Sequence, residues 1–215
     1  MIIEKTIEFV KQKLQGAEAG HDWFHIERVY KNAVQIAQGS NDINILVIEL
    51  GALLHDIADS KFHNGDESVG PKIAREFLEN NLVDENVIQE VVNIIENISF
   101  KNTKDNTITY TSKELQIVQD ADRLDAIGAI GIARAFNYGG FKNRELYNPE
   151  VSPNLNMSKE EYKNSNAPTL NHFYEKLLLL KDKMNTQKGK ELAEERHRFM
   201  EHFLQQFYKE WNAEL

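Results

Sequence analysis

The chain has 215 residues and no cysteine, and its 34 acidic residues outnumber its 25 basic residues to give a net charge of −9. This length predicts one domain, and the missing cysteine excludes disulfides, thiolate zinc sites, iron–sulfur clusters and cysteine nucleophiles. The acidic balance disfavours duplex nucleic acid as a partner. A small phosphorylated substrate stays possible, because a basic cluster and a bound cation can reverse the field inside a pocket.

The first segment, MIIEKTIEFVKQKLQ, alternates apolar and charged residues and lacks the apolar core of a signal peptide. The longest apolar stretch, residues 43–54, is interrupted by Asn44 and Glu49. It falls short of the ~20 apolar residues that span a bilayer. We therefore expect a cytoplasmic protein without a membrane partner, either a monomer or a homodimer.

Hydrophobic residues recur with helical spacing along the whole chain, which predicts an all-α fold. We expect helices over residues 2–14, 22–38, 43–57, 71–81 and 85–98, from 112 through the GAIGIA run at 128–133, and over 169–185 and 187–211. Asp42 and Asp84 are predicted N-caps, and Gly39 is a predicted C-terminal cap. The helix over 43–57 is apolar nearly all round, as expected of a central buried helix.

The segment from Tyr138 to Ala167 is long, polar and rich in Asn and Gly, which is typical of a lid or a disordered loop. The two helices beyond it carry apolar stripes that need a packing partner. We therefore predict a single domain over 1–215, with a core over about 20–137 and C-terminal helices over about 169–212 packed on it.

Metal-ligand side chains occur in three apolar helical contexts: His25, the pair His55-Asp56, and Asp122. Imidazole and carboxylate without thiolate suit one divalent cation such as Mn²⁺, Fe²⁺, Ni²⁺, Co²⁺ or Mg²⁺. Burying Asp56 and Asp122 among apolar residues costs several kcal/mol unless a cation or strong hydrogen bonds compensate. Adjacent residues of a helix diverge by ~100°, so His55 and Asp56 should lie where a helix ends.

These residues and their contexts, GHDWFHIERV, ALLHDIADSKF and VQDADRLDAIGAIGIARAF, resemble the H…HD…D signature of the HD superfamily over residues 20–137. The resemblance implies an all-α HD-domain bundle with one metal between its helices. It also implies hydrolysis of phosphoesters or phosphoanhydrides, in which the metal lowers the pKa of bound water and neutralises phosphate charge.

The resemblance suggests roles for further residues, each with a plainer alternative. Asp59 would orient or deprotonate the attacking water or else cap a turn, and Glu67 is the competing base or a first-turn charge. Lys61 would bind a phosphate oxygen or else be a solvated lysine. Arg28 would bind phosphate or else pair with a neighbouring side chain. His21 would hold phosphate or act as a general acid, or else be an exposed residue at the N-terminus of its helix.

Asp125 lies three residues after Asp122 and therefore shares its helix face. Such a residue can support a ligand histidine by accepting a hydrogen bond from its second ring nitrogen. The alternative is an ion pair with Arg123 or Arg134.

The sequence thus predicts a metal-dependent phosphohydrolase for a small phosphorylated substrate. A nucleotide is the first choice of substrate, and one candidate reaction splits a nucleoside triphosphate into a monophosphate and pyrophosphate. A cyclic-nucleotide or dinucleotide phosphodiesterase is the alternative enzyme, but its extra histidines are missing, since only His63 lies between Asp56 and Asp122. A non-catalytic metal-binding scaffold is the third hypothesis.

Overall fold

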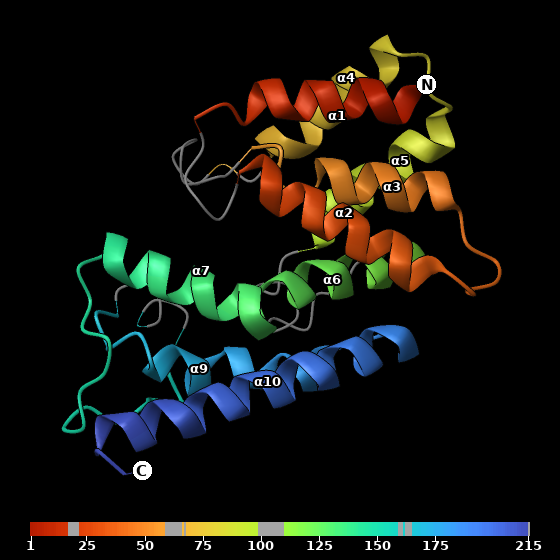
Figure 1. Cartoon of the computed structure of the whole chain (residues 1–215). Coiled ribbons are helices and arrows are strands. Elements are labelled where there is room, and N and C mark those ends of the chain that lie inside the picture. The colour runs from red at the N-terminus through yellow and green to blue at the C-terminus, as the bar shows by residue number, and fades with distance from the viewer. Residues whose placement is uncertain are drawn as a thin grey trace. The chain divides into compact units, whose positions relative to one another are not determined.

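The computed structural model describes residues 1–16, 22–58, 66, 68–98, 110–158, 161 and 165–214. Over these residues the protein is all-α and contains no β-strand (Figure 1), which confirms the predicted fold class. The chain divides into two compact units, Met1–Asp122 and Arg123–Leu215. The single domain over 1–215 stays a prediction.

The first unit is built from helices whose ends follow local capping signals. They are α1 (Ile2–Lys13), α2 (Trp23–Ala37), α3 (Ile45–Leu54), α4 (Val69–Asn80), α5 (Glu85–Asn97) and most of α6 (Lys113–Asp125). Asp84 caps α5 by accepting a hydrogen bond from the Asn86 backbone N–H at 2.9 Å, as predicted. Gly39 follows the C-cap of α2 with a φ of +82°, a conformation that glycine adopts without strain.

Helix α3 is the centre of the first unit and packs against α1, α2 and α5 (Figure 1). Seven of its ten residues are buried, as its nearly uniform apolar sequence predicts. Gly51 lets α3 approach its neighbours closely, because an added Cβ would lie 3.1 Å from Ile94 Cδ1 and 3.6 Å from Val118 Cγ2. A tightly held α3 fixes the position of the residues that follow it.

The predicted N-cap of α3 was wrong. Asn44, not Asp42, accepts a hydrogen bond from the Leu46 backbone N–H, at 3.2 Å. Asp42 instead adopts a φ of +56° in the preceding turn. Asp and Asn tolerate this left-handed conformation better than most residues do, so a turn is an equally natural place for Asp42.

The second unit contains α7 (Gly128–Phe141), α9 (Asn171–Glu175), the 3₁₀ turns η3 (Leu177–Leu179) and η4 (Lys181–Lys183), and α10 (Gln187–Trp211). Helices α7 and α10 pack together (Figure 1). Aromatic rings of α7, α9 and α10 form part of the core of the second unit. The ring centroids of Phe173 and Phe203 lie 5.9 Å apart in a stacked pair, and those of Phe136 and Phe173 lie 6.0 Å apart.

Two predicted helices of this region are interrupted. The helix expected to run through GAIGIA ends at Asp125 and restarts at Gly128, because Ile127 is extended and Gly128 has a φ of +74°. The helix expected over 169–185 breaks at Lys176, whose φ and ψ of −145° and −57° leave α9 followed by two 3₁₀ turns. In addition, the first four residues of the predicted loop 138–167 belong to α7.

Across the described part of the chain, no helix combines the length and apolar character that membrane spanning requires.

The carboxylates of Glu90 and Glu114 repel each other and lower the stability of the folded state. Burial, followed by the charge of Glu114, raises the pKa of Glu90 above its ordinary value of 4.5. The folded state then holds this proton more tightly than the unfolded state does, so ionised Glu90 costs stability above its folded pKa, and the cost disappears below pH 4.5.

We predict that Glu90→Gln stabilises the protein at pH 8 by about 0.5 kcal/mol, the scale of partly exposed charge interactions. The gain should shrink as the pH falls towards 4.5, because wild-type Glu90 then binds its proton. Urea denaturation at both pH values measures it, with exposed Glu76→Gln as the matched control. A gain that is equal at both pH values would contradict this explanation.

We also predict that Gly51→Val destabilises the protein by roughly 1–3 kcal/mol, because the new side chain collides with Ile94 in a packed core. Gly140→Val is the matched control, since nothing lies within 4 Å of a Cβ added at Gly140. Urea denaturation compares the two variants, and equal stability of both would show that α3 has room to spare.

Candidate metal centre

His25 is placed by the first turn of α2. Asp22 is the N-cap of this helix, and its side chain accepts a hydrogen bond from the His25 backbone N–H at 2.9 Å. The side chain of His25 is only 3% exposed. The capping carboxylate thus fixes the backbone of a histidine whose ring lies in the interior.

His55 is placed by the end of α3. The helix ends at Leu54, and His55 is its C-cap, which confirms the prediction that His55 and Asp56 lie where a helix ends. The His55 Nδ1 lies 2.8 Å from the carbonyl oxygen of Ala52. A carbonyl can only accept, so Nδ1 carries the proton, and the Nε2 lone pair is left to bind a metal.

Asp122 on α6 completes a cluster within the first unit. Its Oδ1 lies 3.6 Å from His25 Nε2 and 3.9 Å from His55 Nε2. The ligand atoms of the three residues all lie within 4.8 Å of one another. Ligands that share one cation at ~2.0–2.2 Å stand ~3.0–3.6 Å apart. The observed separations of 3.6 and 3.9 Å lie at or slightly beyond this range, so small side-chain movements would bring the three atoms onto one divalent cation.

Exposure differs sharply within the cluster. His55 is 5% exposed and His25 3%, whereas Asp122 is 40% exposed. The histidines therefore form the inner wall of the site, and the carboxylate borders solvent. Such a site can be reached from outside.

Polar contacts between helices hold these ligands in place. Asn32 of α2 donates to the carbonyl of Ala121 at 3.4 Å, and Gln119 donates to the carbonyl of Asn97 at 3.0 Å. Glu114 accepts a hydrogen bond from the Asn44 backbone N–H at 2.8 Å, which ties α6 to the start of α3. Asn32 was not predicted as a site residue, although a polar residue seven positions after His25, on the same helix face between Val29 and Ala33, was a signal in the sequence.

The role of Asp120 was also not predicted from the sequence. The residue lies two positions before Asp122 and is completely buried, and it takes part in polar interactions there. The DAD motif therefore divides its two carboxylates between the protein interior and the cluster. An alternating pair on a helix points in nearly opposite directions, and only one of them can join the histidines.

Asp56, the fourth predicted ligand, directly follows His55 and is partly buried. It is not part of the cluster of His25, His55 and Asp122. Its side chain engages in an interaction within the protein. Ligation by Asp56 stays a prediction.

The predicted catalytic residues His21, Asp59 and Glu67 and the predicted phosphate ligand Lys61 lie outside the described residues. Arg28, the other predicted phosphate ligand, is partly buried on α2, one turn after His25. Its proposed role is not tested by this placement.

Asp125 belongs to the second unit, where it is 1% exposed. Arg134 donates to its Oδ2 at 2.5 Å, which is one of the alternatives left open by the sequence. Arg196 donates to the neighbouring Leu124 carbonyl at 2.5 Å, and burial lowers the pKa of this guanidinium while the charge of Asp125 opposes the shift. Support of a ligand histidine by Asp125 stays a prediction.

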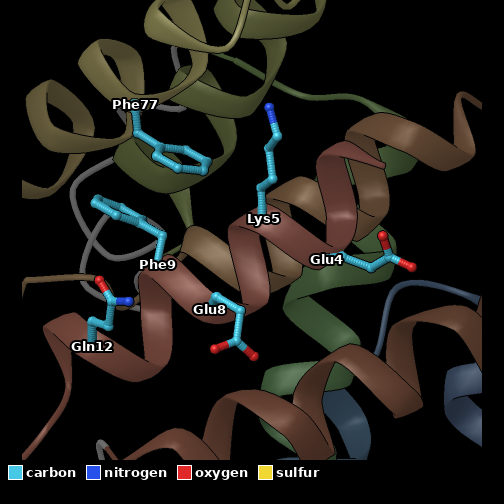
Figure 2. A pocket seen from close by; sticks show the side chains of 6 residues that line it. All are labelled: Glu4, Lys5, Glu8, Phe9, Gln12 and Phe77. Carbon is cyan, nitrogen blue, oxygen red and sulfur yellow. The ribbon is translucent and has the colours of Figure 1, made fainter.

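A separate hollow of about 450 Å³ lies between α1 and α4 of the first unit. Figure 2 shows Phe9 and Phe77 facing each other in it, with ring centroids 4.1 Å apart, while Glu4 and Glu8 point away from the rings. None of its six lining residues is a predicted site residue. The stacked rings pack α1 against α4. We therefore assign the two phenylalanines a structural role and assign no ligand to this hollow.

The first unit of this all-α protein brings together two histidines and an aspartate from α2, the end of α3 and α6, an arrangement that fits a metal site. The HD domain model matches residues 23–127, the segment that contains the cluster. The chain belongs to the HD superfamily.

Similar proteins of known structure extend the match over nearly the whole chain. A Bacillus thuringiensis HD-superfamily hydrolase is 47% identical, with a TM-score of 0.77, and the match covers 98% of this chain and 97% of that one. YpgQ of Bacillus subtilis is 36% identical over 96% of this chain and 92% of its own length. The structure of YpgQ in complex with ADP superposes with a TM-score of 0.74 and 32% identity, covering 97% of each chain.

We predict that replacing His25 or His55 by Ala, or Asp122 by Asn, weakens Mn²⁺ binding by ~10-fold or more, because the histidine changes remove a ligand atom and the Asp122 change removes the negative charge of its ligand oxygen. Isothermal titration calorimetry measures the affinity. The control is His202→Ala, since His202 is exposed on α10.

The same titration of Asp56→Asn tests the fourth ligand. Affinity that stays at the wild-type level in all three cluster variants would contradict the assignment of the centre.

Proposed function

We propose that the protein is a metal-dependent phosphohydrolase that acts on a nucleotide. The first reaction to test is the splitting of a nucleoside triphosphate into a monophosphate and pyrophosphate. The observation that carries this proposal is the convergence of His25 Nε2, His55 Nε2 and Asp122 Oδ1, with the His55 ring held by the Ala52 carbonyl.

These three atoms would hold the cation, with Asp56 as the predicted fourth ligand. When bound, a divalent cation activates water at neutral pH and neutralises phosphate charge. The histidines supply neutral donors and Asp122 one negative charge, so a bound divalent cation would give these three ligands a net charge of +1, and ligation by Asp56 would bring it to zero; in either case the cation offsets the negative charge of the site. That offset matters because the chain as a whole carries −9 and repels polyanions.

Access and substrate contacts support a small phosphorylated substrate. The 40% exposure of Asp122 leaves one side of the cluster open to solvent. Arg28 lies one turn after His25 and would pair with a phosphate oxygen, as would Lys61. Asp59 and Glu67 are the candidates to take a proton from the attacking water, and His21 is the candidate to donate one to the leaving group.

The choice of a nucleotide has a separate source of support. YpgQ, a relative that matches 96% of this chain, forms a complex with ADP. A diphosphate nucleotide combines the phosphoanhydride expected of the chemistry with a size suited to a site that opens to solvent.

We expect Mn²⁺-dependent hydrolysis when the protein is tested on a panel of nucleoside triphosphates, nucleoside diphosphates, nucleoside monophosphates and cyclic dinucleotides. Inorganic phosphate and pyrophosphate should be measured separately, since pyrophosphate release identifies the triphosphate reaction. His55→Ala should lower kcat/KM by ~100-fold or more, because it removes a metal ligand. His202→Ala should keep wild-type activity.

Three outcomes would overturn parts of this proposal. Equal activity of His55→Ala and wild type would remove the metal centre from the reaction. Cleavage of cyclic dinucleotides alone would make the protein a phosphodiesterase. Metal binding without turnover of any substrate would favour a non-catalytic scaffold.

A further inference from the structure

Phe24 is a large apolar side chain on the polar side of α2. It is 62% exposed, although it immediately precedes the buried His25. Other residues of the same side of the helix are polar, among them Glu27, Lys31 and Gln35. Phe24 therefore carries an exposed aromatic ring at the position directly before the cluster residue His25, where packing does not require one.

Helix geometry places Phe24 relative to the centre. At ~100° per residue, Phe24 and Arg28 lie on one flank of α2, next to the edge that carries His25. The core-facing residues of the helix, Ile26 and Val29, lie on the opposite side of that edge and are completely buried. The ring of Phe24 thus faces solvent on the flank that borders the ligand histidine.

Trp23, the aromatic residue before Phe24, has a structural role. Trp23 receives the ammonium of Lys11 5.0 Å from its ring centroid, and this contact joins α2 to α1. Phe24 makes no ring contact with another aromatic side chain among the described residues. Its exposed face remains able to receive a planar group.

We propose that Phe24 is the stacking platform for the base of a nucleotide whose phosphates bind at the cluster of His25, His55 and Asp122. This inference rests on the proposed function and names the part of the substrate that is recognised outside the metal centre. A base of any kind has a flat π-face, so stacking on Phe24 binds nucleotides as a class and selects weakly among bases. Arg28, on the same flank, would lie between the ring and the metal-bound phosphates.

The experiment compares two ligands that share a diphosphate and differ in the base and sugar. The affinities of ADP and of inorganic pyrophosphate for the Mn²⁺-loaded protein are measured by isothermal titration calorimetry. Phe24→Ala should weaken ADP binding by ~10-fold, the usual effect of removing one base-stacking ring, and should leave pyrophosphate binding unchanged. Phe24→Tyr should bind both ligands as the wild type does, because it keeps the ring.

Phe199→Ala is the matched control, because Phe199 is 53% exposed on α10. It should change neither affinity. Equal weakening of ADP and pyrophosphate in Phe24→Ala would show that Phe24 acts on the structure of α2, and unchanged ADP binding would show that it is not the platform. Failure of the wild type to bind ADP would also overturn the inference.

The result is separable from the proposed function. If the wild type binds ADP through Phe24 but hydrolyses no nucleotide, the platform stands and the hydrolase proposal fails. If nucleotides are hydrolysed and Phe24→Ala binds ADP normally, the hydrolase proposal stands and the platform fails.

Discussion

Two imidazoles and a carboxylate that approach one another at the edge of a hydrophobic interior are the constraint on which the first unit depends. Interior imidazoles lose hydration, and this loss must be offset by hydrogen bonds or by a cation. One ring nitrogen of His55 is satisfied by the Ala52 carbonyl, and its other nitrogen is directed at Asp122. A shared cation would satisfy His25 Nε2, His55 Nε2 and the Asp122 carboxylate together, which no single hydrogen bond can do.

One of these histidines directly follows the last residue of α3, the most apolar helix of the described part of the chain. Helix α3 is held on several sides by α1, α2 and α5, and Gly51 removes the side chain that would keep Ile94 and Val118 away. A helix packed in this way cannot slide or rotate without losing buried apolar area. His55, at its C-terminus, is therefore fixed by packing that lies entirely outside the metal centre, as a precise ligand geometry requires.

Local signals in the sequence predicted much of this arrangement. The cap at Asp84 has a short-range cause and was predicted, as was the end of a helix at His55, whereas the equally local cap at Asp22 was not predicted. Asp42 and Asn44 could each have capped α3, and only the backbone angle of Asp42 decides between them. The family resemblance predicted that His25, His55 and Asp122 share one metal, together with Asp56, and the structure brings the first three together.

Features that depend on distant residues were not predictable in the same way. The sequence from Leu124 to Ala133 suits a continuous helix, but the helix ends at Asp125 and a new one begins at Gly128. There, Arg134 binds Asp125, Arg196 binds the Leu124 carbonyl, and Arg196 lies 3.0 Å from a Cβ added at Gly128. Arg196 is 72 residues away from Leu124, so no local pattern could reveal it. The burial of Asp120 and the exposure of Phe24 likewise depend on tertiary packing.

The most direct test of the central claim is the anomalous diffraction of crystals grown with Mn²⁺, recorded on the low-energy and high-energy sides of the manganese absorption edge. If the three residues share one cation, one strong manganese peak is expected at ~2.0–2.2 Å from each of His25 Nε2, His55 Nε2 and Asp122 Oδ1. A manganese peak bound elsewhere, with these three side chains hydrogen-bonded only to protein or water, would contradict it.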